Sequence, residues 1–303
     1  MFPADNIWNA RVDGLPVHSL SNAYVTSISA VKPLHPDFGA GQWAGFDIGM
    51  ADAAVPGSQP KIAVTFDFAS ESDPGPYPIP ANPPIEGGNY VTNTGDRHML
   101  IVDTTNCKLY ETWNSWKQPD DSWSAGSGAI FTLTSNVLRP DGWTSSDAAG
   151  LPILPGLARY DEAASGVITH ALRFTVHCSQ GYVWPGRHTA TSGACPTPPP
   201  MGLRFRLKAS FVIAPSLHPQ VKVILTALKQ YGMFVADNSS SGDWYISGLH
   251  DPNWNDDAPV SQLSAVKGSD FEAIDESGLM LSPNSGQVRL PLSKALWLPL
   301  LIR

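Results

Sequence analysis

Short runs in which apolar and polar residues alternate dominate this chain, and only one segment has the periodicity of a long helix. In the run 61–68, Ile62, Val64 and Phe66 share one face under the two-residue period of a β-strand. Six further runs predict strands, of which the first two and the last two would form hairpins: 97–103, 108–113, 169–176, 202–211, 233–237 and 244–247. The helix is expected at 219–231, between Pro219 and Gly232. One such helix cannot cover a doubly wound sheet, so the pattern predicts a mainly β protein.

Proline and glycine interrupt these strands often, with 28 prolines and 26 glycines in 303 residues. The segment 70–88 alone contains six prolines, which cannot donate to a sheet ladder. Long loops are therefore expected at 70–95, 114–165 and 178–201. Cys178 and Cys195 lie in the last of these and are predicted to form a disulfide that stabilises the fold by about 3 kcal/mol. Cys107 is left over.

These features predict a single all-β domain over 1–303 with one or two short helices. The expected architecture is a two-sheet antiparallel β-sandwich of the concanavalin or jelly-roll kind, with 282–303 as a terminal strand or tail. A chain of this length can bury a large core, and ten tryptophans supply apolar volume for it. No run of 18 apolar residues is present, so no transmembrane segment is expected.

Charge narrows the class of partner. The chain carries 19 Lys and Arg against 27 Asp and Glu, a net charge of −8, and clustered cations are what nucleic acids require. Nucleic acid is therefore not expected as a partner. Only 15% of the residues are charged, which together with a disulfide indicates an exported protein whose signal peptide has been removed. We expect a secreted, monomeric protein.

Histidines at strand ends and in the disulfide loop are candidates for proton transfer. His98 opens the strand 97–103, and His188 with Tyr182 lies in the loop 178–201. An imidazole titrates near neutral pH and can act as a general base, although a hydrogen-bonded structural histidine at a strand end is the favoured interpretation of His98. His98, His170 and His188 could also converge on zinc or copper, but the default expectation is no cofactor and no metal.

Carboxylates are the second set of candidate catalytic groups. Asp103 and Glu111 border the first hairpin, and Asp237 borders the second. Hydrolysis of a glycosidic bond usually needs two carboxyl groups about 5 to 10 Å apart, one of them an acid. The sequence offers these types of residue but not their distance.

Arginine and tryptophan are the candidate substrate-binding residues. Guanidinium groups bind carboxylates in pairs of hydrogen bonds, and indole faces stack on sugar rings. Alternation in 202–211 predicts that Arg204 and Arg206 point outward to form a basic strand face. The full candidate set is Arg97, Arg173, Trp184, Arg187, Arg204, Arg206 and Trp244.

Four short segments resemble a family of secreted bacterial all-β proteins: 71–80, Gly95-Asp96-Arg97-His98, 139–143 and 242–246. The resemblance runs from Phe2 to Ser277. It implies export and a single domain, and it implies no activity and no catalytic residue.

Together these features favour a secreted carbohydrate-active enzyme that hydrolyses glycosidic bonds of a polysaccharide or oligosaccharide with paired carboxylates. A polysaccharide lyase is the first alternative, in which histidine and tyrosine move the proton while Arg204 and Arg206 neutralise a uronate. A non-catalytic carbohydrate-binding or cell-surface protein is the second. The nucleophile-elbow serine, His-Glu-x-x-His and phosphate-loop motifs are absent from the sequence, which disfavours those enzyme classes.

Overall fold

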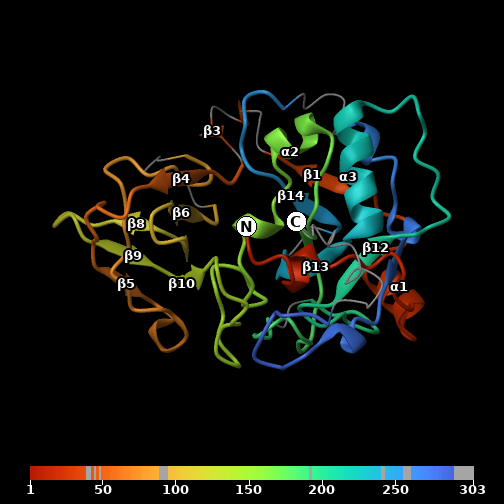
Figure 1. The fold of residues 1–303 in the computed structure, drawn as a ribbon, viewed down its shortest axis with the longest axis horizontal. Helices are drawn as coiled ribbons and strands as arrows, with labels where there is room; N and C mark the ends of the chain where they lie inside the picture. Colours follow the sequence, from red (N-terminus) through yellow and green to blue (C-terminus); the bar gives the residue numbers. More distant parts are fainter. Residues whose placement is uncertain are drawn as a thin grey trace, which may run out of the picture.

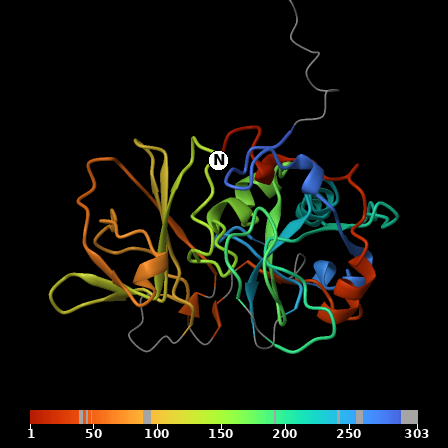
Figure 2. The ribbon, with the colours of Figure 1, turned by 90° about the horizontal axis from the view of Figure 1, so that it is seen from below.

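The computed structural model describes residues 1–38, 42–43, 46–47, 49–88, 95–190, 193–239, 243–254 and 261–289. They form two β-rich lobes that lie side by side (Figures 1 and 2). The chain starts in one lobe, crosses to build the other, and returns, so that β1 and the last strands share a sheet. We call the lobe built by 52–132 the first lobe and the lobe that contains the chain's beginning and its second half the second lobe.

The second lobe is organised around a six-stranded mixed sheet in the order β1-β14-β11-β13-β12-β15. Its strands are β1 (His35–Asp37), β11 (Leu172–Val176), β12 (Arg204–Leu207), β13 (Met233–Asn238), β14 (Tyr245–Ser247) and β15 (Phe271–Ala273). Around it lie the helices α1 (Ser21–Ile28), α2 (Tyr160–Ser165) and α3 (Pro219–Gln230), and the 3-10 turns η1 (Ile7–Asn9), η3 (Leu154–Gly156), η4 (Gly268–Asp270) and η5 (Ser277–Leu279). Trp244 is fully buried among Phe174, Phe205 and Phe271, with ring centroids 5.2–5.6 Å from its own.

The first lobe contains a four-stranded sheet in the order β10-β7-β6-β4. Its strands are β4 (Asp52–Val55), β6 (Met99–Asp103), β7 (Lys108–Trp113) and β10 (Ser127–Thr132). A three-stranded sheet covers it, formed by β5 (Val64–Phe66), β8 (Trp116–Lys117) and β9 (Trp123–Ala125), and η2 (Ala69–Glu71) follows β5. A short pair, β2 (Gln42–Trp43) and β3 (Phe46–Asp47), precedes the lobe.

The two faces of β7 belong to different cores because side chains alternate along a strand. Tyr110 packs on Tyr77 within the first lobe, with ring centroids 5.5 Å apart. Leu109 points the other way and packs with Leu154 of η3, which joins the lobes through an apolar contact. Glu111 shares this second face.

The prediction of a mainly β protein with short helices is confirmed. The hairpin of β6 and β7 and the helix α3 are confirmed as well. The described strands also include parallel pairs, such as β4 with β6 and β11 with β13, which an antiparallel sandwich does not contain. The expected hairpin of 233–237 with 244–247 is wrong, because β11 lies between β13 and β14.

The outward basic face predicted for β12 is also wrong. Arg204 and Arg206 are 0% and 7% exposed. The N-terminal segment covers this face of the sheet, and its carbonyl oxygens accept the guanidinium protons: Ile7 and Ala10 from Arg204, Val12 and Leu15 from Arg206.

The disulfide between Cys178 and Cys195 is present, and Cys107 is exposed and free. Of the predicted terminal strand or tail, 282–289 runs without a named strand and the rest lies outside the described residues. No helix among the described residues is long and apolar enough to cross a membrane.

Candidate active site between the lobes

A cleft of about 340 Å³ opens where the two lobes meet. The first lobe contributes residues at the start of β6 and β10 and the end of β7, and the second lobe contributes the end of β13. The loops 144–148 and 188–190 complete it. The lining residues are Phe68, Glu71, Asp96, His98, Trp113, Ser127, Thr144, Ser145, Ser146, Asp147, Ala148, His188, Ala190, Asp237 and Asn238.

The loop 144–150 is bound to both lobes by hydrogen bonds to its backbone. From the first lobe, Ser127 Oγ donates to the carbonyl of Ser145 at 2.7 Å, and His98 Nε2 lies 3.0 Å from the carbonyl of Ser146. From the second lobe, Ala236 on β13 accepts the amide proton of Ala149 at 2.9 Å. This loop therefore fixes the position of Asp147 relative to both walls of the cleft.

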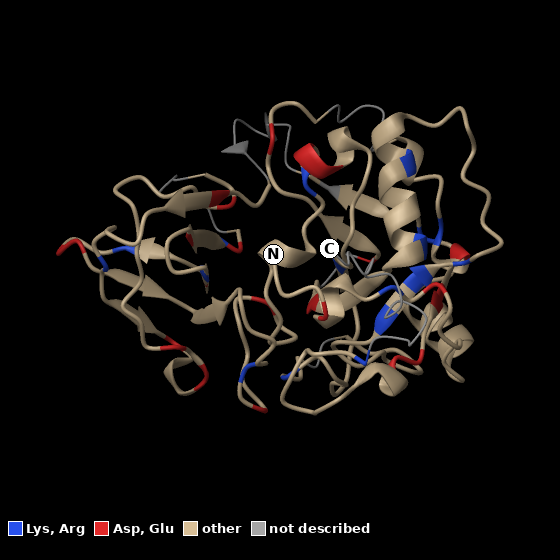
Figure 3. Ribbon diagram, in the orientation of Figure 1, with Lys and Arg blue, Asp and Glu red and all other residues tan. Residues whose placement is uncertain are grey.

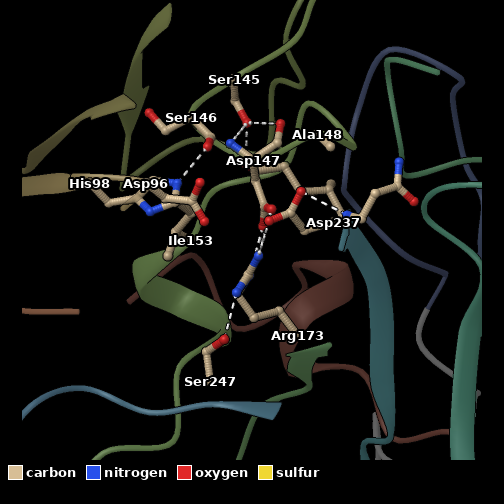
Figure 4. A network of polar contacts seen from close by, with 12 residues as sticks. Asp96, His98, Ser145, Ser146, Asp147, Ala148, Ile153, Arg173, Asp237 and Ser247 are labelled. Carbon is tan, nitrogen blue, oxygen red and sulfur yellow. Dashed lines mark hydrogen bonds and ion pairs between the residues drawn. The ribbon is translucent and has the colours of Figure 1, made fainter. Parts of the chain in front are cut away.

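Asp147 and Arg173 form a buried ion pair at the base of the cleft (Figure 4). The guanidinium of Arg173, on β11, donates from Nε to one carboxylate oxygen at 2.8 Å and from Nη2 to the other at 2.6 Å. Its Nη1 donates to Ser247 Oγ at 2.6 Å. Burial opposes the charge of Arg173, but the carboxylate of Asp147 outweighs it and raises the arginine pKa.

Asp237 is an acid of the cleft whose pKa is shifted and whose carboxyl group is accessible. It lies near the end of β13, just after the register shift opposite Thr175, and its side chain is 25% exposed in the cleft. Burial, and then the negative charge of Asp147, raise its pKa to about 7, while Arg173 at 3.4 Å and His98 partly offset this. Near neutral pH this carboxyl group is populated in both protonation states.

His98 is held as an imidazolium between two acceptors. Its Nδ1 lies 2.6 Å from a carboxylate oxygen of Glu86, and its Nε2 faces the Ser146 carbonyl, which can only accept. Burial would lower the histidine pKa, but the charge of Glu86 and its hydrogen bond raise it to about 9. In this arrangement His98 has no lone pair for a general base and acts as a charged support for the loop.

One group of possible metal ligands is found among the described residues: Glu86, Asp96 and His98, whose ligand atoms lie within 4.8 Å of one another. A metal ion there would have to displace the proton that His98 shares with Glu86. His170 lies elsewhere, in the second lobe, where its ring bonds Glu162 at 3.0 Å and the Ala171 carbonyl at 2.8 Å. The three histidines considered from the sequence are thus not brought together.

The remaining walls of the cleft combine acids with aromatic rings. Glu71 Oε2 lies 3.5 Å from His188 Nε2, and His188 Nδ1 donates to the Ala148 carbonyl at 2.9 Å. On the first lobe, Asp96 is exposed, and the indole nitrogen of Trp113 donates to it at 3.4 Å. His188 is the second predicted histidine that the structure places in the cleft.

The other predicted acids have structural contacts. Asp103 lies at the far end of β6 and accepts the amide protons of Thr105 and Asn106 in the hairpin turn. Glu111 is 0% exposed and accepts the amide protons of Ile153 and Leu154 at 2.9–3.0 Å, at the start of η3. Burial raises the pKa of Glu111 to about 7 against these hydrogen bonds.

The side chains predicted to bind substrate mainly make hydrogen bonds and packing contacts within the protein. Arg97 is buried against Trp116, with its guanidinium 3.8 Å from the ring centroid. Arg187 donates to the carbonyls of Arg139 and Pro283. Trp184 donates to the Ser285 carbonyl, Trp244 donates to the Ser29 carbonyl, and Arg204, Arg206 and Tyr182 do not line the cleft. Arg173 is the exception, since it contacts Asp147 and Asp237 beneath the cleft.

Several residues of the cleft were not predicted as functional, namely Phe68, Glu71, Asp96, Trp113 and Asp147, and neither was Glu86, which bonds His98. The patterns that contain some of them, such as the alternating runs 61–68 and 108–113, indicate strands and not a site, and Asp147 lies in a loop without periodicity. No family model, curated protein or solved structure matches this chain.

Proposed function

We propose that this cleft hydrolyses glycosidic bonds and that Asp237 is the proton donor. The observation that supports this most strongly is the position of Asp237, whose carboxyl group is accessible in a cleft with aromatic rings and lies beside the buried pair of Asp147 and Arg173. Burial and the charge of Asp147 raise its pKa to about 7. A glycosidic oxygen is a poor leaving group unless it is protonated, and a carboxylic acid that stays protonated near neutral pH supplies that proton.

The second carboxylate of the mechanism is Asp96. It is exposed on the first lobe, across the cleft from Asp237 (Figure 4), and the hydrogen bond from Trp113 orients it. Its role is to accept a proton from the attacking water or to stabilise positive charge at the anomeric carbon while Asp237 protonates the leaving oxygen. Asp147 remains paired with Arg173, so its charge acts on the pKa of Asp237 instead of on the substrate.

Elimination is less well supported than hydrolysis. The arginines that would neutralise a uronate, Arg204 and Arg206, are buried outside the cleft, and both ring nitrogens of His98 face acceptors. The disulfide between Cys178 and Cys195 supports a secreted enzyme, because such bonds persist in oxidising compartments.

The test is the release of reducing ends from a panel of polysaccharides by the wild type and by Asp237→Asn, which keeps the shape and removes the acid. We expect a loss of at least about 100-fold, the usual contribution of a general acid. Asp67→Asn is the matched control, because Asp67 is an exposed acid next to Phe68 that does not line the cleft. Unchanged turnover in Asp237→Asn would exclude this mechanism, and an unsaturated product would indicate elimination.

A further inference from the structure

Phe68 and Trp113 form an aromatic surface at the mouth of the cleft. Phe68 is 50% exposed although it is a large apolar residue, and both side chains line the cleft. Their ring centroids are 6.3 Å apart and their planes are tilted by 36°. An exposed ring of this kind costs solvation free energy in the free protein, which is recovered when the apolar face of a ligand covers it.

The backbone of Gly126 positions both residues of this aromatic surface. Its carbonyl accepts the amide proton of Phe68 at 2.9 Å, and its amide donates to the Trp113 carbonyl at 2.8 Å. The indole ring of Trp113 lies so close to Gly126 that an added Cβ would come within 2.2 Å of it. The two rings are thus placed by the backbone between β9 and β10, before any ligand arrives.

The charge of the cleft selects against anions. Its described lining residues include the acids Glu71, Asp96, Asp147 and Asp237 and no lysine or arginine, and the imidazolium of His98 has both ring nitrogens directed at Glu86 and the Ser146 carbonyl. Figure 3 shows a concentration of Lys and Arg around α3 and β12, with others spread over both lobes. Arg173 compensates Asp147 from below, but the ion-pair contact of Glu71 is with His188 alone among the described residues. A uronate entering the cleft would meet carboxylates without a guanidinium partner.

From this geometry we propose that Phe68 and Trp113 bind the face of a sugar ring and that Glu71 disfavours anionic glycans. The inference rests on the proposed function for the identity of the ligand as a glycan. Sugar C–H groups pack on the rings, and the hydroxyl groups reach the polar side chains that line the cleft, among them Asn238. The discrimination works by repulsion, because a like charge disfavours the anionic ligand without any added contact to the neutral one.

The experiment measures binding, not turnover, by titrating indole fluorescence and by calorimetry. The probes are neutral hexose oligosaccharides and uronate oligosaccharides of matched length and linkage. Asp237→Asn is used to prevent cleavage. We expect the neutral ligands to bind at least about tenfold more tightly than the uronates, a ratio that falls as salt screens the carboxylates.

Three variants separate the parts of the proposal. Phe68→Ala should weaken binding of neutral ligands about tenfold, and Gly126→Ala should do the same by displacing Trp113. Glu71→Gln should improve uronate binding several-fold with little change for neutral ligands, while Asp67→Asn, one residue before Phe68 but outside the cleft lining, should change neither. Circular dichroism checks that each variant is folded.

Each outcome is decisive. Uronates that bind as tightly as the neutral ligands, or more tightly, overturn the selection, and unchanged affinity in Phe68→Ala overturns the aromatic surface. Absence of binding by every probe overturns both. Selective binding by a wild type that releases no reducing ends supports this inference and contradicts the proposed hydrolysis, so the two failures are distinguishable.

Discussion

Asp147 and Arg173 are joined by two hydrogen bonds of 2.8 and 2.6 Å, and neither side chain is more than 1% exposed. Asp147 belongs to a loop that is also bound to the first lobe, and Arg173 belongs to β11, a central strand of the second lobe. This pair therefore ties the lobes together directly beneath the cleft. It also sets the charge that Asp237 experiences.

Replacing Arg173 by methionine should destabilise the protein by about 3–5 kcal/mol, because the carboxylate of Asp147 would remain buried without a counter-charge. Urea unfolding of the wild type and the variant measures this. The control is Arg11→Met, whose ion pair with Asp13 is 41% and 45% exposed and should contribute less than about 1 kcal/mol. Equal losses of unfolding free energy in the two variants would show that the buried pair contributes no more to stability than the exposed pair.

The local pattern was enough to predict α3 and the hairpin of β6 and β7, because both depend on residues close in sequence. It also gave the correct alternation of Arg204 and Arg206 with Leu203 and Phe205 on opposite sides of one strand. The pattern could not show that another segment of the chain covers the side of β12 that carries the two arginines. The cover is the N-terminal segment, whose carbonyls accept the arginine protons and which has no periodic pattern to reveal its place.

The same limit applies to the site. Asp237 could be named from its position beside a strand end. Its partner Asp147 lies 90 residues earlier in a loop without periodicity, and only the pairing of β11 with β13 brings Arg173 between them. Glu111 looked catalytic because it is an acid on a strand, but which face of β7 meets the second lobe depends on tertiary packing.

His98 and Glu86 predict a pH dependence of stability. The pKa of His98 rises from 6.5 to about 9 on folding because the Glu86 charge outweighs burial. The native state therefore binds this proton more tightly, and its contribution is complete below pH 6.5 and is lost as pH rises through 9. Urea unfolding at pH 6 and pH 9 should show a larger loss for the wild type than for Glu86→Gln. Equal losses would mean that the pair does not titrate as described.

The disulfide should stabilise both the fold and the cleft. It closes a loop that carries His188 and Ala190, which line the cleft. Replacing Cys178 and Cys195 together by alanine should lower the free energy of unfolding by about 3 kcal/mol, because the unfolded chain gains freedom. Thermal unfolding measures the loss, and Cys107→Ser, at an exposed free thiol, is the control. An equal effect of the control would contradict the prediction.

Glu111 is predicted to stabilise the fold and to have no catalytic role. Its carboxylate satisfies the amide protons of Ile153 and Leu154 at the start of η3, so Glu111→Ala leaves buried donors unpaired and should cost about 2–4 kcal/mol. Glu111→Gln retains an acceptor oxygen and should cost less. Turnover by Glu111→Gln, measured below its unfolding midpoint, should stay within a few-fold of the wild type. A loss comparable to that of Asp237→Asn would return Glu111 to the catalytic groups.

The pH dependence of turnover tests the electrostatic argument for Asp237 itself. A general acid must be protonated, so activity should fall as pH rises through about 7, the raised pKa of Asp237. Asp147→Asn removes the like charge that raises this pKa and frees Arg173, at 3.4 Å, to stabilise the Asp237 carboxylate. Both effects lower the pKa of Asp237, so the descending limb should move to lower pH. Arg173→Met removes the offsetting cation and should move that limb to higher pH. Asp67→Asn should leave it in place, and a limb that does not move in either of the first two variants would show that another group controls the rate.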